Sequence, residues 1–287
     1  MTVTEPNVEA VRPQMSDIDV FGVTHPGLRR PINEDQFFIA TVHKTLQVYS
    51  SSLPADAMPD LTSESRGWLF MVADGVGGRP EGEKASATAL RAIAEYVTHT
   101  MRFYYRNDPQ HTEATFLRDL QNAVLKSDEV VRAEAEGTAT TLTMVAVRWP
   151  RAYLIQVGDS RCYRLRDGRL EQLTKDQTMA QALVDAGVLP PGAAEGSRWR
   201  HVLTGAIGGR ETTPVTTPID CRWSDVVLLC TDGLTKHVSD EEIKEQLATR
   251  KSSEAICRAL LALALERGGS DNITLVAGRL RDPAPAH

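Results

Sequence analysis

The segment WLFMVADGVGG, residues 68 to 78, begins with an uninterrupted apolar run that is followed by the pair Asp74-Gly75. A short apolar run bounded by turn residues predicts a buried β-strand. Asp74 and Gly75 then stand where that strand ends, and both residue types favour turns. The same arrangement, an apolar run followed by an aspartate, recurs at Asp159 and Asp232. The sequence therefore predicts strands whose ends carry carboxylates.

Strands are expected wherever β-branched and apolar residues cluster between turn residues. The expected strands are Ile18–Thr24, Trp68–Ala73, Leu142–Val147, Ala152–Val157, Arg161–Arg166, Arg169–Leu173, Val226–Cys230 and Ile273–Ala277. Two of them flank Asp167-Gly168, a dipeptide that favours a two-residue hairpin turn. Hairpins join antiparallel neighbours, so we expect largely antiparallel sheets.

Helices are expected between these strands. Apolar residues recur every four positions over 85–97 and again over 116–124, which gives each segment one apolar face. A last helix is expected around 254–266, before Gly268 and Gly269. Helix starts are also predicted at two capping boxes, Thr174 with Gln177 and Ser239 with Glu242. Helices mixed with hairpin-linked strands indicate the α+β class.

Composition narrows the class of protein. The chain has 287 residues, a formal net charge of −6, and 41% hydrophobic and 24% charged residues, which is typical of a soluble globular protein. The chain has no dense Lys/Arg run, so we expect no nucleic-acid partner. It has no long apolar stretch and no signal peptide, so we expect no membrane association. Its four cysteines form no C-x-x-C pair, which favours reduced thiols in the cytoplasm.

One domain is expected over residues 17–281. Residues 1–16 and 282–287 are polar or rich in proline and are expected to form flexible tails. Stretch 41–66 holds Ser50-Ser51-Ser52 and two prolines, and we expect a surface insertion between two strands there.

More acidic residues stand beside predicted strands, at Asn33-Glu34-Asp35 and at Asp271. One such aspartate is ordinarily a turn residue. Several that converge would repel one another unless a cation neutralised them. Carboxylate oxygens suit Mg²⁺, Mn²⁺ or Ca²⁺, and the seven histidines show no spacing typical of zinc. No G-x-S-x-G elbow or P-loop lysine is present, which leaves a metal-activated water as the plausible nucleophile.

Six short motifs follow one another along the chain. They are Arg30-Pro31-Ile32-Asn33-Glu34-Asp35, Val72-Ala73-Asp74-Gly75-Val76-Gly77-Gly78, Gly137-Thr138-Ala139-Thr140-Thr141, Val157-Gly158-Asp159-Ser160-Arg161, Leu229-Cys230-Thr231-Asp232-Gly233-Leu234 and Gly269-Ser270-Asp271-Asn272-Ile273-Thr274. In this order they resemble the motifs of the PP2C, or PPM, protein phosphatases, and especially those of compact bacterial members. The resemblance runs from about Asp17 to Leu280. It implies two packed, mainly antiparallel sheets with helix pairs on both outer faces.

The resemblance also implies a role for each acidic residue. The implied metal ligands are Asp74, the carbonyl of Gly75, Asp159, Asp232 and Asp271. Asp74 would bridge two core ions, Asp232 and Asp271 would bind the second, and Asp159 would share a third ion with Asp232. For Asp159, a structural Asx-turn is the competing interpretation.

The implied catalytic residues lie in the first motif. Glu34 and Asp35 resemble the residues that hold metal-bound waters, and Arg30 resembles the clamp on the substrate phosphate, whose geometry suits a guanidinium. Many eukaryotic members have histidine at the position of Val76, where it is thought to protonate the leaving alkoxide. Valine cannot do so, which leaves either a metal-bound water or an unidentified residue as the acid. His201 is expected to be an ordinary surface or hydrogen-bonding histidine, as is His237.

The function implied by the resemblance is hydrolysis of phosphoserine and phosphothreonine in proteins, with Mn²⁺ or Mg²⁺ as two core ions and a third. We expect a monomer, with a serine/threonine kinase as a suggested partner. Residues 176–200 correspond to the flap of the family, either a mobile element that contacts substrate or a passive surface loop. Two alternative functions stay open: a non-catalytic regulatory module, and a phosphohydrolase of small phosphate esters.

Overall fold

Two antiparallel β-sheets pack face to face in the computed structural model, which describes residues 13, 17–45, 62–76, 81–101, 112–194, 196–249 and 251–281. The first sheet has the order β1 (Ile18–His25), β11 (Ile273–Leu280), β10 (Val226–Cys230), β7 (Arg161–Arg166) and β8 (Arg169–Gln172). The second has the order β2 (Asp35–Thr45), β3 (Thr62–Val76), β5 (Leu142–Arg148), β6 (Arg151–Val157) and β9 (Val215–Asp220), and β4 (Ala139–Thr140) pairs with β3.

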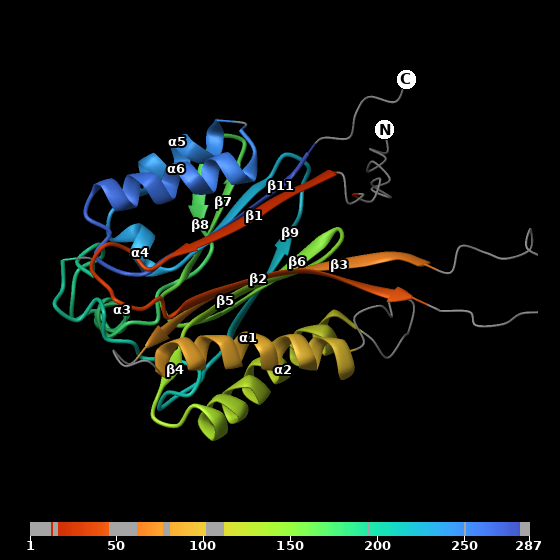
Figure 1. Ribbon diagram of the computed structural model, residues 1–287, viewed down its shortest axis with the longest axis horizontal. Helices are drawn as coiled ribbons and strands as arrows, with labels where there is room; N and C mark the ends of the chain where they lie inside the picture. The colour runs from red at the N-terminus through yellow and green to blue at the C-terminus, as the bar shows by residue number, and fades with distance from the viewer. Residues whose placement is uncertain are drawn as a thin grey trace, which may run out of the picture.

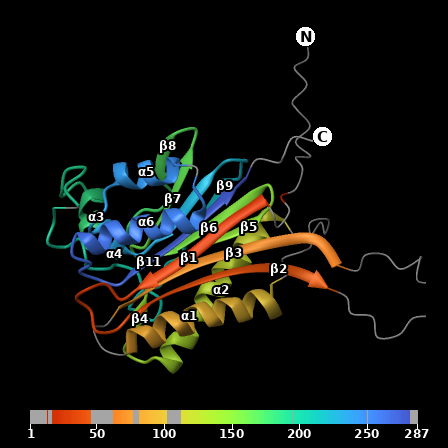
Figure 2. The same cartoon turned by 45° about the horizontal axis from the view of Figure 1, so that its top comes forward.

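Helices cover both outer faces, as Figures 1 and 2 show. Helices α1 (Glu81–His99) and α2 (Glu113–Glu134) lie on the second sheet. Helices α4 (Asp232–Thr235), α5 (Asp240–Ala248) and α6 (Ser253–Glu266) lie on the first. Helix α3 (Met179–Asp185) lies near one end of the sheets, beside α4. The predicted α+β class with two packed antiparallel sheets and flanking helices is confirmed.

The long apolar run of β3 follows from this layered arrangement. Successive side chains of a strand point to opposite faces. Leu69, Met71 and Ala73 therefore pack under α1 and α2, while Trp68, Phe70 and Val72 pack against the other sheet. Both faces are buried, so the strand reads as a continuous apolar segment rather than an alternating one.

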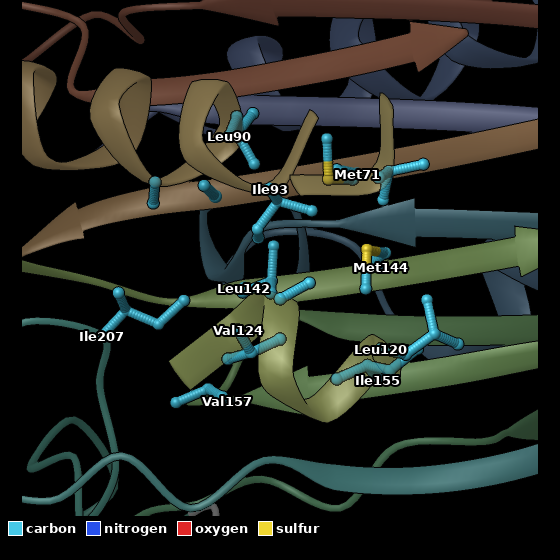
Figure 3. Close-up of a cluster of buried hydrophobic side chains, with 14 of the residues drawn as sticks. Met71, Leu90, Ile93, Leu120, Val124, Leu142, Met144, Ile155, Val157 and Ile207 are labelled. Atoms are coloured by element: carbon cyan, nitrogen blue, oxygen red, sulfur yellow. The ribbon is translucent and has the colours of Figure 1, made fainter. Parts of the chain in front are cut away.

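The core beneath α1 and α2 shows how the helical period is used. Figure 3 shows Ile93 from α1 and Leu120 and Val124 from α2 gathered over Met71 and Met144 of the sheet. All five side chains are fully buried. The apolar faces predicted over 85–97 and 116–124 are thus the faces that meet the sheet.

Several local predictions are confirmed. Asp167 and Gly168 have positive φ angles of 49° and 73°, as the predicted hairpin turn between β7 and β8 requires. The capping box of Ser239 with Glu242 is present at the start of α5. Gly187, with φ 71°, follows the end of α3.

The predicted capping box of Thr174 with Gln177 is wrong. Helix α3 is capped by Thr178, whose hydroxyl accepts a hydrogen bond from the amide of Gln181. The side chain of Gln177 is instead used in tertiary contacts, because its Oε1 accepts a hydrogen bond from the amide of Gly158 at 2.8 Å.

The expected insertion at 41–66 is narrower than predicted, because β2 continues to Thr45 and β3 begins at Thr62. The stretch 46–61 lies outside the described residues. So does the tail 282–287, and so does the tail 1–16 apart from Pro13. Within the described ranges, no helix has both the length and the apolar character needed to cross a membrane.

Candidate metal centre

The acidic residues singled out by the sequence gather at one end of the two sheets. Asp35 opens β2 and Asp74 lies near the end of β3, both in the second sheet. Asp159 follows β6 of the same sheet, whereas Asp232 follows β10 and Asp271 precedes β11 in the first sheet. Carboxylates from both sheets therefore meet where the sheets end.

Asp35 and Asp74 form the buried side of this cluster. They stand opposite each other in the register of β2 and β3, and Asp35 is only 1% exposed. One carboxylate oxygen of Asp35, Oδ2, accepts a hydrogen bond from the hydroxyl of Thr231 at 2.7 Å. The other, Oδ1, is buried and has no hydrogen-bond partner among the described residues. A buried carboxylate oxygen without a donor is costly unless a ligand neutralises it.

Burial dominates the electrostatics of this pair. It raises the pKa of Asp35 to about 7, although the Thr231 hydrogen bond acts in the opposite direction. Burial, followed by the charge of Asp35, raises the pKa of Asp74 well above its usual range. Both groups are thus arranged so that a nearby positive charge would favour their ionised forms.

Glu34 and two glycines pack closely around the end of β3. The amide of Gly75 donates a hydrogen bond to the carbonyl of Glu34 at 3.2 Å. A Cβ on Gly75 would lie 2.3 Å from the carbonyl oxygen of Gly82, and one on Gly82 would lie 2.4 Å from Oε1 of Glu34. That Oε1 is a second buried oxygen with no partner in the described part of the chain. Only glycine permits this close approach of backbone and carboxylate.

Asp159 is also withdrawn from solvent, with 8% exposure. Burial, followed by the charges of Asp232 and Asp176, raises the pKa of Asp159 to about 7. The backbone before it is fixed by Gln177, which both donates its amide to the carbonyl of Gly158 and accepts from the amide of Gly158. A buried carboxylate held by a rigid loop is a candidate ligand, and whether it serves a metal stays a prediction.

Asp232 and Asp271 already have cationic partners. Lys236 Nζ lies 2.6 Å from Oδ2 of Asp232 and 2.7 Å from Oδ2 of Asp271. Arg30 contacts both oxygens of Asp271, with Nε at 2.8 Å from Oδ1 and a terminal nitrogen at 3.0 Å from Oδ2. His201 Nδ1 is 3.7 Å from Asp232.

The contacts of Asp232 and Asp271 reverse the effect of burial on their pKa values. Burial alone would raise the pKa of Asp232, but the contact with His201 and the charge of Lys236 lower it. For Asp271, hydrogen bonds from Lys236 and Arg30 likewise outweigh burial and lower the pKa. The carboxylates that come from the first sheet, Asp232 and Asp271, therefore have basic partners, whereas burial dominates the pKa values of Asp35 and Asp74 in the second sheet.

The residues present fit a divalent cation. They offer hard oxygen ligands, two of which are buried without donors among the described residues, and burial raises the pKa values of Asp35 and Asp74. In the described ranges, no three Asp, Glu, His or Cys side chains already stand as a group that could hold an ion. The positive charges of Lys236 and Arg30 balance part of the negative charge of these carboxylates.

The structure thus brings the predicted residues to one end of the sheets, and their assignment as ligands stays a proposal. Val76 is 38% exposed. His237 is a hydrogen-bonding histidine, as predicted, since its Nε2 contacts the hydroxyl of Ser270. His201 lies closer to the site than predicted. Sequence reasoning missed Lys236, whose one signal was its position four residues after Asp232, directly after the short helix α4.

Solved structures of bacterial phosphatases share this architecture. The catalytic domain of the serine/threonine protein phosphatase PstP, in complex with two manganese ions, matches with a TM-score of 0.68 and 32% identity, over 92% of this chain and 99% of that one. The family model for protein phosphatase 2C matches residues 48–273. The chain belongs to the protein phosphatase 2C family.

Two relatives show how much of the chain is shared. The serine/threonine protein phosphatase PstP of Mycobacterium tuberculosis is 37% identical over 220 residues, which are 75% of this chain and 40% of that protein. The serine/threonine phosphatase stp of Listeria monocytogenes is 30% identical over 213 residues, which are 72% of this chain and 82% of that protein. The match thus spans well under half of the mycobacterial protein and most of the listerial one.

Proposed function

We propose that this chain is a metal-dependent phosphatase that hydrolyses phosphoserine and phosphothreonine in proteins. The observation that carries the proposal is the convergence of carboxylates from both sheets, beside the guanidinium of Arg30, around buried oxygens that find no donor in the described part of the chain. The phosphatase names of the relatives support the same activity.

The roles of the residues follow from their environments. Asp74, the Gly75 carbonyl, Asp232 and Asp271 would hold two Mn²⁺ or Mg²⁺ ions, and Asp159 with Asp232 a third. Bound ions supply positive charge to phosphate oxygens and lower the pKa of a water. The Thr231 hydroxyl fixes one oxygen of Asp35, and the other has no hydrogen-bond donor among the described residues.

Arg30 would bind the substrate phosphate. Its side chain is 45% exposed while its guanidinium is oriented by Asp271, so the fork is both accessible and held in place. A planar guanidinium matches the geometry of phosphate oxygens and can donate two parallel hydrogen bonds. The hydrogen bond to Asp271 is the largest cause of the raised pKa of Arg30. The charge of Glu34, four residues further along the chain, contributes less.

A cleft beside the carboxylates is large enough to take a segment of a phosphorylated peptide. Its volume is about 1010 Å³, and its lining includes Asp159 and Asp232 as well as Lys175, Arg200 and His201 from the predicted flap region and its border. Such a volume is at the upper limit of pockets that enclose drug-sized ligands. The mixed charges suit a peptide that carries a phosphate. A kinase partner, a monomeric state and a mobile flap stay predictions.

The test is a phosphatase assay of the purified chain with Mn²⁺. We expect turnover of phosphoserine and phosphothreonine peptides, with higher kcat/KM than for small aryl phosphates. The matched control is Asp74→Asn, which keeps the shape of the side chain and removes its charge. Absence of turnover with either Mn²⁺ or Mg²⁺ would show a non-catalytic module, and faster turnover of small esters would show the other alternative.

A further inference from the structure

Lys236 lies between two carboxylates of the candidate metal centre. It follows α4 one turn after Asp232, so both side chains project from the same face of that helix. Its ammonium contacts Asp232 at 2.6 Å and Asp271 at 2.7 Å. One cation therefore bridges two carboxylates that come from different segments of the chain.

Burial makes these contacts strong. The side chains of Lys236, Asp232 and Asp271 are 21%, 19% and 20% exposed. Ion pairs that are largely withdrawn from water are screened little by salt. The ammonium is therefore held by two short contacts that salt screens little.

The bridge involves the two carboxylates that come from the first sheet. Asp232 follows β10 and Asp271 precedes β11. The ammonium of Lys236 therefore lies where two proposed ligands of one ion converge.

We propose that Lys236 is a built-in cation that occupies the Asp232–Asp271 pair, so that a metal ion binds this pair only by displacing the ammonium. The proposal rests on the proposed function, because it takes these carboxylates as metal ligands. Displacement costs two charge-assisted hydrogen bonds. Lys236 therefore weakens metal binding at this pair and sets the metal concentration at which the site fills.

The test is calorimetric titration of the full chain with Mn²⁺ after chelation. Two variants remove the charge: Lys236→Met keeps the apolar stem, and Lys236→Gln keeps a hydrogen-bonding tip and serves if the first does not fold. We expect Mn²⁺ to bind at least about tenfold more tightly to either variant at one site, or one additional ion to bind. The control is Lys175→Met, because Lys175 lines the same cleft but pairs with the exposed Asp185.

Thermal unfolding gives a second readout. Without metal, the charge-removing variants should melt below the wild type, because Asp232 loses the ammonium; with saturating Mn²⁺ the difference should narrow or reverse. A purely structural lysine would lower the metal-free melting temperature and leave Mn²⁺ affinity unchanged, which would overturn the proposal, as would weaker binding in the variants. Tighter binding without phosphatase activity in any form would instead refute the proposed function and leave this inference standing.

Discussion

Asp35 and Asp74 face each other across adjacent strands, β2 and β3, at the buried end of the sheet. Residues directly opposite in an antiparallel pair hold their Cβ atoms about 4.5–5.5 Å apart, and like charges there are destabilising. Asp35 is 1% exposed and one of its oxygens lacks a donor among the described residues. The pair is therefore unfavourable unless it is protonated or bound to a cation.

The first prediction is a pH-dependent stability of the metal-free protein. The pKa of Asp35 is raised from 3.8 to about 7, and that of Asp159 likewise, chiefly by burial. A folded-state pKa above the unfolded value favours the folded protein at low pH, and this contribution is lost as pH rises through about 7. In chelator, the melting temperature should thus fall as pH rises from about 4 to about 7, and these groups should add no further change above that range. Asp35→Asn should flatten that dependence, and a wild-type melting temperature that rises with pH would contradict it.

The second prediction concerns charge in the metal centre. Asp74→Asn and Asp232→Asn each remove one carboxylate from an oxygen ligand set, so each should lose most of kcat. The measurement is turnover of a phosphopeptide across a Mn²⁺ titration, together with exhaustive chelation of the wild type. Full activity after chelation, or a near-normal rate in either variant, would exclude the assignment.

The third prediction is that Arg30→Ala chiefly weakens substrate binding. A charge-assisted contact is worth about 1.5–3 kcal/mol, so kcat/KM should fall roughly ten- to 150-fold, mainly through KM. The neighbouring Arg29 is exposed and provides a matched control as Arg29→Ala. Unchanged kinetics of Arg30→Ala on a phosphopeptide would show that this guanidinium does not contact the phosphate.

The fourth prediction separates two roles for Asp159. Its carboxylate is 8% exposed and carries a raised pKa, so the metal-free fold gains little from its charge. Asp159→Ala should therefore leave the metal-free melting temperature nearly unchanged and lower kcat. A variant that melts much earlier but turns over normally per folded molecule would identify Asp159 as a turn residue.

The fifth prediction concerns Gly75. A methyl group there would lie 2.3 Å from the Gly82 carbonyl and must displace backbone, so Gly75→Ala should destabilise the fold and weaken Mn²⁺ binding. Gly278→Ala in β11 is a suitable control, because no atom of the described residues lies within 4 Å of the place that its methyl group would take. Equal melting temperatures for the two variants would argue against a packing constraint at Gly75.

Strong local patterns were predictable from the sequence, and features that depend on distant partners were not. The run before Asp74 identified β3 because both faces of that strand are buried. Strand β9 was not predicted; its segment contains Pro218, which is tolerated because β9 is at the edge of its sheet. Thr174 was mistaken for a cap because Gln177 fits the local pattern, whereas the fold uses Gln177 to hold Gly158.

In the candidate site, too, local patterns were predictable and contacts between distant residues were not. The aspartates were visible because each stands beside an apolar strand, and their order resembled a known family. Lys236 was not visible, because its importance depends on Asp271, which is 35 residues away along the chain and meets it only in the folded protein.

The carboxylate cluster draws ligands from both sheets, which has a consequence for the whole domain. An ion bound by Asp74 of the second sheet and Asp232 of the first would link the two sheets at the end where their carboxylates meet. Binding to the folded state alone adds its free energy to folding. Backbone amides of β3 and β10 should then exchange with deuterated solvent more slowly as Mn²⁺ is added, so that the supply of metal governs the lifetime of the fold as well as its chemistry.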